Sequence, residues 1–249
     1  MKLTYRLNKN GLVVIGGKDI ESEVIIPNED CFKGKNYPVI AIGNRAFSSC
    51  EKLTSIVIPD SVTRIGNEAF RDCSALTSIE IPDSVTKIGL FAFLDCSSLT
   101  SVVIPDSVTK IGDWAFWGCE GLTSIVIPDS VTKIGEDAFL GCSALTSIIV
   151  DKGNRHYDSR ENCNAIIESD TNTLIVGCSN TVIPDSVTEI EKTAFRGRSG
   201  LTSIVIPDSI TKIGPGAFWR CSGLTSIVIN DTSLLKWAGV PDGVEIVKP

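Results

Sequence analysis

The chain has 249 residues, 43% of them hydrophobic, and a formal net charge of −7. This composition supports a sizeable core. The net negative charge excludes the strongly basic surface that a nucleic-acid-binding protein presents to phosphates. No run of about 18 apolar residues indicates a membrane span. The opening MKLTYRLNKNGLVVIGG lacks the apolar segment of a signal peptide.

The N-terminal segment predicts a β-hairpin. Asn10-Gly11 lies between two runs of alternating apolar residues, and this dipeptide in such a context is the strongest short hairpin signal. The terminal edges of a sheet promote aggregation unless they are covered. We therefore expect residues 1–23 to form an N-terminal hairpin cap.

A 23-residue unit dominates the rest of the chain. The sequence LTSIVIPDSVTRIGNEAFRDCSA recurs almost unchanged, with copies at 53–75, 76–98, 99–121, 122–144 and 201–223. Such a period indicates a repeat architecture, in which each unit contacts only its neighbours.

The apolar positions of one unit predict its local structure. In the copy at 122–144, alternate apolar residues from Leu122 to Ile127 predict a short strand, and Pro-Asp-Ser predicts the turn that ends it. Ala138, Phe139 and Cys142 have the spacing of one helical turn that faces the core. One unit cannot bury this face alone, but stacked copies can. The sequence therefore predicts a solenoid with columns of identical core residues.

The IPxxVxxIGxxAFxxC units resemble the BspA-like leucine-rich repeats of bacterial surface antigens, over essentially the whole chain. The resemblance implies a right-handed stack of about nine coils over residues 24–229, with a parallel β-sheet on the concave face. Serine, for example Ser130, takes the asparagine position of the general pattern, so serine hydroxyls are expected to satisfy those backbone groups. We predict one domain, residues 1–249. The nine expected strands begin at Val24, Ile56, Ile79, Val102, Ile125, Ile148, Thr181, Ile204 and Ile227.

One coil, at 151–177, is enlarged. Phe139 and Phe195 are 56 residues apart, which is two periods plus ten residues. The added NAIIESDTNTLIVG has two β-prone runs around Asp170-Thr171 and predicts a hairpin. Pairing Ile166 with Ile175 also sets Cys163 opposite Cys178.

The enlarged coil holds the only histidine. His156, Asp158 and Cys163 include the residue types of a nucleophilic triad, but they are neighbours in a polar loop without an oxyanion-hole motif, which favours a solvated loop. His156, Cys163 and Cys178 lack any standard metal-ligand spacing. We therefore predict no catalytic residue, no metal and no cofactor. A disulfide between Cys163 and Cys178 stays open and depends on the redox compartment.

The chain ends in a predicted cap at residues 230–249. DTSLLKWAG indicates a short helix that starts near Thr232–Ser233 and stops at Gly239. Trp237 is expected to lie over the last coil.

Two columns of identical residues invite a chemical interpretation. The first column consists of cysteines, for which buried packing as small apolar side chains is favoured over a metal or redox role. Arg198 replaces cysteine once in this column. Its cysteines are Cys50, Cys73, Cys96, Cys119, Cys142 and Cys221. The second column repeats the aspartate of the Pro-Asp-Ser turn, where capping of the local backbone is favoured over calcium binding. Its members are Asp60, Asp83, Asp106, Asp129, Asp185 and Asp208.

The variable positions around the Ala-Phe pair predict a binding patch. Apolar side chains there fall on adjacent coils, and exposed apolar clusters with tryptophan often mark interaction sites. The alternative is that they only cover the convex turns. The patch consists of Leu90, Phe91, Leu94, Trp114, Trp117, Leu140 and Trp219. The opposite strand face shows uniform Ser and Val rows, and solenoids commonly bind partners on such a surface.

The resemblance also implies a function. BspA-like proteins are secreted or attached to the surface of host-associated bacteria and some protists, and members are implicated in adhesion. It thus implies an extracellular or cell-surface, non-enzymatic binding module whose partner is a host matrix or cell-surface protein. Self-association through the apolar patch is a further expectation. The rival hypothesis is a structural spacer without a ligand of its own.

Overall fold

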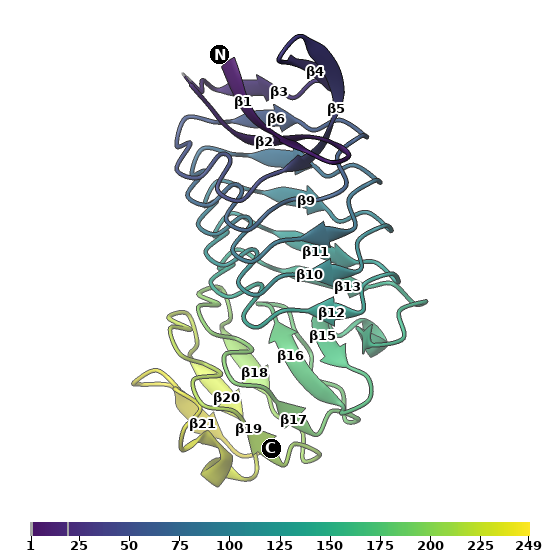
Figure 1. The fold of residues 1–249 in the computed structure, drawn as a ribbon. Coiled ribbons are helices and arrows are strands. Elements are labelled where there is room, and N and C mark those ends of the chain that lie inside the picture. Colours follow the sequence, from purple (N-terminus) through teal and green to yellow (C-terminus); the bar gives the residue numbers. More distant parts are fainter. Residues whose placement is uncertain (1, 19) are drawn as a thin grey trace. The chain divides into compact units, whose positions relative to one another are not determined.

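The computed structural model describes residues 2–18 and 20–249, which divide into two compact units. Unit 1 runs to Leu122 and includes Ser130–Phe139; unit 2 consists of Thr123–Asp129 and Leu140–Pro249. Within each unit the chain winds into stacked coils with parallel strands (Figure 1), which confirms the predicted solenoid. That the whole chain is one domain stays a prediction.

Two β-hairpins lie at the start of unit 1. β1 (Lys2–Asn8) and β2 (Gly11–Lys18) pair antiparallel, which confirms the predicted hairpin. A second antiparallel pair, β4 (Glu29–Phe32) and β5 (Lys35–Ile42), was not predicted. β2 pairs parallel with β5, and residues 12–14 are buried. The first hairpin therefore contributes to the core beside the first coil.

The repeats contribute strands to a first parallel ladder. In unit 1 these are β3 (Glu23–Ile25), β6 (Ser55–Val57), β7 (Ser78–Glu80) and β9 (Ser101–Val103). In unit 2 they are β11 (Ser124–Ile127), β13 (Ser147–Val150), β18 (Ser203–Val205) and β20 (Ser226–Val228). β21 (Glu245–Val247), in the segment predicted as the C-terminal cap, pairs parallel with β20. Ile125 pairs with Ile148, one period away, as predicted. The strand predicted at Thr181 is absent, because the Val182 N–H donates to the Cys163 carbonyl of the enlarged coil.

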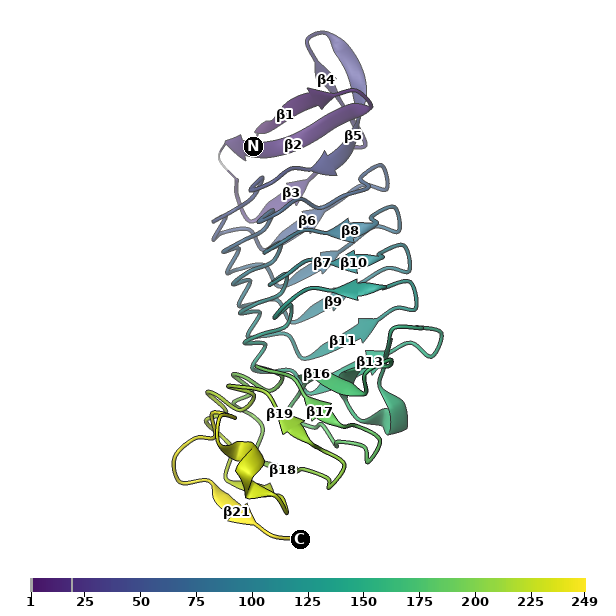
Figure 2. The same ribbon diagram turned by 60° about the horizontal axis from the view of Figure 1, so that its bottom comes forward.

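A second ladder follows the turn in each unit. In unit 1 it contains β8 (Lys87–Ile88), β10 (Lys110–Ile111) and β12 (Lys133–Ile134). In unit 2 it contains β16 (Thr173–Gly177), β17 (Glu189–Ile190) and β19 (Lys212–Ile213). Figure 2 shows the two rows of unit 1, with β6, β7 and β9 in one and β8 and β10 in the other. A Cβ on Gly89 would lie 2.6 Å from backbone atoms of Gly66, so glycine permits the close approach of successive coils after this ladder.

The segment around each Ala-Phe pair is not helical, contrary to the prediction. In the coil of Glu68 and Asp72, these two residues have positive φ angles of 54° and 58°. The N–H of Phe70 donates to the carbonyl of Ala92, in the next coil, at 2.8 Å. Hydrogen bonds between coils therefore replace those of a helix, and the N–H groups that make them point toward the later coil.

The core consists of columns of identical side chains. Phenylalanine rings from Phe47 to Phe139 stack in unit 1 with centroids 5.2–5.4 Å apart, and Phe195 and Phe218 stack in unit 2. The predicted cysteine column is buried except for half-buried Cys50. Its thiols donate to backbone carbonyls, as Cys119 does to Phe93 at 3.2 Å. Serine hydroxyls at the expected position also donate to backbone carbonyls in several coils, as Ser130 does to Val108 at 2.8 Å, but the equivalent hydroxyl of Ser209 is buried without a partner.

The enlarged coil contains the predicted hairpin. Its elements are β14 (Tyr157–Asp158), the 3₁₀ turn η1 (Arg160–Asn162), β15 (Ala165–Glu168) and β16. A register shift between Ile166 and Ile167 pairs Ile166 with Val176, so the predicted pairing with Ile175 is wrong. The shift also removes the basis for setting Cys163 opposite Cys178, and both cysteines are free.

The C-terminal segment closes unit 2 with backbone groups. Only a 3₁₀ turn, η2 (Thr232–Leu235), forms where a short helix was predicted. The carbonyls of Trp237 and Ala238 accept the N–H groups of Gly216 and Phe218 at 2.8 and 2.7 Å. Trp237 therefore lies over the last coil through its backbone, as expected, while the residue remains 69% exposed.

Candidate protein-binding surfaces

Four of the seven predicted patch residues lie at the surface of unit 1. We call Leu90, Phe91, Trp114 and Trp117 the aromatic patch; Trp117 is 38% exposed and the others are half-buried. Leu94 and Leu140 are 6% and 8% exposed, so their predicted availability for contact was wrong. Trp219 belongs to unit 2 and is 50% exposed.

Phe91 and Trp114 form a stacked pair across two coils, with ring centroids 5.0 Å apart and planes tilted by 14°. Both residues have a left-handed backbone, with φ angles of 53° and 51°. Their N–H groups hold this conformation by donating to the next coil, to Asp113 and Glu136 at 3.0 and 2.8 Å. A left-handed backbone costs about 1–2 kcal/mol for such residues. Stacking offsets part of this cost.

Neighbouring coils show that this position does not require an aromatic side chain. Arg45 and Glu68 occupy it in the preceding two coils and form an ion pair at 2.8 Å. Asp137 occupies it in the coil that follows Trp114. The aromatic pair is therefore a local departure on a surface that is otherwise polar.

An acidic pocket borders the aromatic patch. Its volume is about 430 Å³, and four successive coils contribute its lining residues Ser49, Glu51, Asp72, Ser74, Asp95, Ser97, Gly118 and Glu120. Trp117 borders it, because its carbonyl accepts the Asp95 N–H at 2.8 Å and Gly118 follows it in the chain. Any Cβ on Gly118 would clash with the Asp95 carboxylate. Burial, then the Asp72 carboxylate, raises the pKa of Asp95, while Arg71 opposes this shift.

Trp219 lies in a basic cluster of unit 2. The guanidinium carbons of Arg196 and Arg220 are 4.3 and 5.6 Å from the centroid of its ring. These are cation–π distances. We call the three residues the basic cluster.

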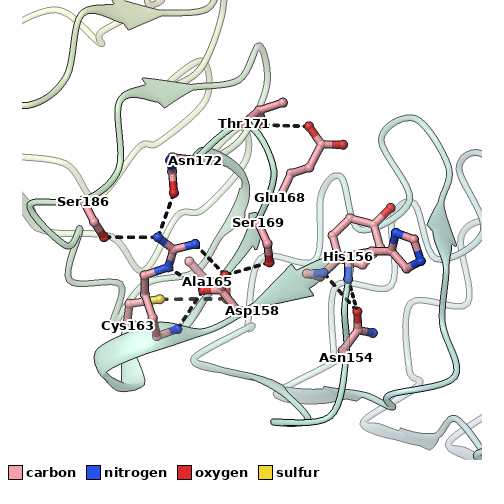
Figure 3. Close-up of polar contacts among 12 residues, drawn as sticks. Asn154, His156, Asp158, Cys163, Ala165, Glu168, Ser169, Thr171, Asn172 and Ser186 are labelled. Atoms are coloured by element: carbon pink, nitrogen blue, oxygen red, sulfur yellow. Dashed lines mark hydrogen bonds and ion pairs between the residues drawn. The ribbon is translucent and has the colours of Figure 1, made fainter.

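The candidate triad of the enlarged coil is not assembled. His156 is exposed and lies beside Tyr157, pointing away from the Arg160–Asp158 pair (Figure 3). Cys163 is buried, and burial raises its pKa to about 11. A thiol with this pKa stays protonated near neutral pH and is a poor nucleophile.

A polar network holds the enlarged coil together instead. Arg160 donates to both carboxylate oxygens of Asp158 at 2.7 and 2.6 Å, to Asn172 at 2.8 Å and to Ser186 at 3.3 Å (Figure 3). Ser169 donates to the same carboxylate at 2.8 Å. Burial of Asp158 would raise its pKa, but the hydrogen bonds from Arg160 and Ser169 outweigh it, so the pKa is lowered. These hydrogen bonds join separate segments of the coil, and they occupy both oxygens of the Asp158 carboxylate.

Arg198 stands at the cysteine position beneath the enlarged coil and is fully buried. It donates to the carbonyl of Gly177 at 2.7 Å and to that of Cys142 at 3.0 Å. Burial lowers its pKa. The long side chain thus bridges backbone groups that flank the enlarged coil.

The strand face exposes a stripe of β-branched side chains, which is the predicted row of Val and related residues opposite the core. In unit 1 it comprises Ile25, Val57 and Val103, with Glu80 in place of the missing member; in unit 2 it comprises Val126, Ile149, Val182 and Val205. Exposure reaches 72% at Val182. Alternation along the strands identified this row in the sequence, because its members point opposite to the core residues.

Other kinds of site have little support among the described residues. No three His, Cys, Asp or Glu residues within residues 2–18 and 20–249 are grouped so that they could hold a metal ion. No helix in that part of the chain has the length and apolarity that crossing a membrane requires.

Comparisons with known proteins agree with this architecture. A family model described as a BspA type leucine rich repeat region matches residues 40–167 and 166–237, in six copies. No curated protein matches the chain.

Solved structures with similar folds come from bacterial leucine-rich repeat proteins. One from Bacteroides ovatus is 28% identical with a TM-score of 0.68; the alignment covers 100% of this chain and 66% of that protein, so the chain spans about two thirds of it. A leucine rich cell surface protein from Faecalibacterium prausnitzii is 26% identical with a TM-score of 0.60, covering 99% and 83%. The T. pallidum leucine rich repeat protein is 25% identical with a TM-score of 0.61, covering 98% and 96%.

Proposed function

The chain belongs to the BspA-type leucine-rich repeat family, and from that premise we propose that it is a non-enzymatic protein-binding module of a secreted or surface-attached bacterial protein. The similarity to a protein described as a cell surface protein supports this localisation. The proposed partner class is a host matrix or cell-surface protein.

The aromatic patch is the observation that carries the proposal. Trp117 is exposed, and Phe91 and Trp114 stack at a position where neighbouring coils hold charged residues. The core therefore does not require them. Aromatic side chains supply a large contact area at low entropic cost, and tryptophan is enriched at binding hot spots.

The test uses the double variant Trp114→Ser with Trp117→Ser, assayed against a panel of purified extracellular-matrix proteins immobilised on a biosensor. We expect the wild-type chain to bind at least one of them, and the variant to lose about 30-fold or more in affinity, equivalent to about 2 kcal/mol. The melting temperature should change little, because the patch lies outside the core columns.

A matched control distinguishes the patch from the strand-face stripe. Val57→Ser with Val103→Ser removes two exposed apolar side chains from the same unit, and this variant should bind like the wild type. Loss of binding only in the valine variant would place the site on the strand face. Absence of binding to any matrix protein or cell surface would leave the structural spacer as the better hypothesis.

A further inference from the structure

Two surface clusters, each beside an exposed tryptophan, carry opposite charges. The acidic pocket, bordered by Trp117, is lined by four carboxylates and by no cationic side chain. The basic cluster places two guanidinium groups against Trp219. Each cluster therefore combines a flat apolar surface with charge of one sign, and the signs are complementary.

Several of these charges have no opposite partner within residues 2–18 and 20–249. Among the described residues, Asp95 has no cation within ion-pair distance, and neither Arg196 nor Arg220 has a carboxylate within that distance. Asp72 is paired only with adjacent Arg71, at 3.2 Å. Asp95 is also repelled by Asp72 and Glu120. A cation brought to the pocket would relieve this like-charge repulsion.

We propose that the acidic pocket of one copy binds the basic cluster of a second copy, so that the chain self-associates head to tail. The inference rests on the proposed function only in that Trp117 is shared by both surfaces. Arginine recognises carboxylates with two parallel N–H donors, and the two tryptophans supply apolar contact around the charges. Charge complementarity steers such an encounter and fixes its orientation.

The contact is heterologous, because different surfaces meet. A pair joined by one such contact keeps one free pocket and one free cluster, which can either add further copies or close a ring. The association should be sensitive to salt, since ionic strength screens partly exposed charges.

The test is sedimentation velocity of the wild-type chain and of three charge variants. We expect the wild type to show larger species as its concentration rises at about 20 mM salt, and fewer of them at about 500 mM salt. Asp95→Arg and Arg220→Asp should each lower the association constant at least about tenfold. Lys87→Asp, an exposed charge reversal in unit 1 that is not part of the pocket lining, should leave it unchanged. Thermal melts followed by circular dichroism verify that each variant is folded. If Asp95→Arg is unstable, Asp95→Asn replaces it in the sedimentation experiment.

Mixing supplies the decisive result. An equimolar mixture of Asp95→Arg and Arg220→Asp contains one unaltered pocket and one unaltered cluster on different molecules, so it should form dimers although neither variant does alone. A wild-type chain that stays monomeric at every concentration overturns the proposal, as does a mixture that fails to associate. All three charge variants retain the aromatic patch, so matrix-protein binding by them tests the proposed function separately.

Discussion

Replacing Phe116 by alanine tests the stacked core directly. The ring is fully buried, and its centroid lies 5.2 Å from that of Phe93 and 5.4 Å from that of Phe139. Both neighbours are held in their own coils and cannot collapse into the gap. We expect the variant to lose about 3–5 kcal/mol of unfolding free energy, in the range for a buried phenylalanine whose site relaxes little.

Phe47 is the matched control, because it is equally buried but stacks on a single ring, that of Phe70 at 5.4 Å. Phe47→Ala should therefore cost less than Phe116→Ala by one aromatic contact, about 0.5–1.5 kcal/mol. Urea titrations followed by circular dichroism give both values, provided that the m-values match. Equal losses at the two positions would refute the argument that both flanking rings support Phe116.

Two further predictions concern buried polar groups. Arg198→Met should destabilise the chain by about 1–3 kcal/mol in a urea titration, because two buried carbonyls lose their donors; an unchanged midpoint would mean that desolvation of the charge cancels these bonds. Burial raises the pKa of Cys50 and of Cys163 to about 11, so a thiol reagent at pH 8 should label exposed Cys31 quickly and these two slowly. At pH values below its pKa, the labelling rate of half-buried Cys50 should rise about tenfold for each unit by which the pH is increased, because the thiolate fraction rises by that factor. A rate independent of pH would contradict this.

The repeat made most of the fold predictable. Identical residues at a spacing of 23 must meet identical surroundings, so the pairing of Ile125 with Ile148 and the stacking of phenylalanines follow from the period alone. Both hairpins were predictable because turn residues act locally, although the first turns at Lys9-Asn10, one residue before the predicted Asn10-Gly11, and the second turns around Asp170-Thr171 as predicted.

The failures have a common cause, which is that contacts between coils decided the local backbone. Apolar spacing suggested a helical turn at Ala138–Cys142, but spacing does not reveal that N–H groups bond to the next coil. The residues at 181–183 have a strand pattern and lack a strand because Val182 bonds to the enlarged coil.

The same limit applies to the candidate site. Leu94 resembled Trp117 in the repeat alignment, yet only Trp117 reaches the surface. The acidic pocket combines residues from four coils, which the sequence does not bring together. The opposite charge of the basic cluster likewise becomes visible only when the positions of the arginine side chains around Trp219 are known.

The inter-coil hydrogen bonds have a genetic consequence. Threonine hydroxyls and backbone N–H groups in a coil meet acceptors 23 residues away, as Thr109 meets Thr86. A recombination event that inserts or deletes one whole unit would therefore keep every inter-coil donor opposite a carbonyl. Loss of part of a unit would instead leave backbone N–H groups and threonine hydroxyls without acceptors in the neighbouring coil. The C-terminal segment ends this pattern, since its carbonyls at Trp237 and Ala238 accept the N–H groups of the last coil. Inheritable length variation should thus accumulate between the caps, in whole steps of the repeat.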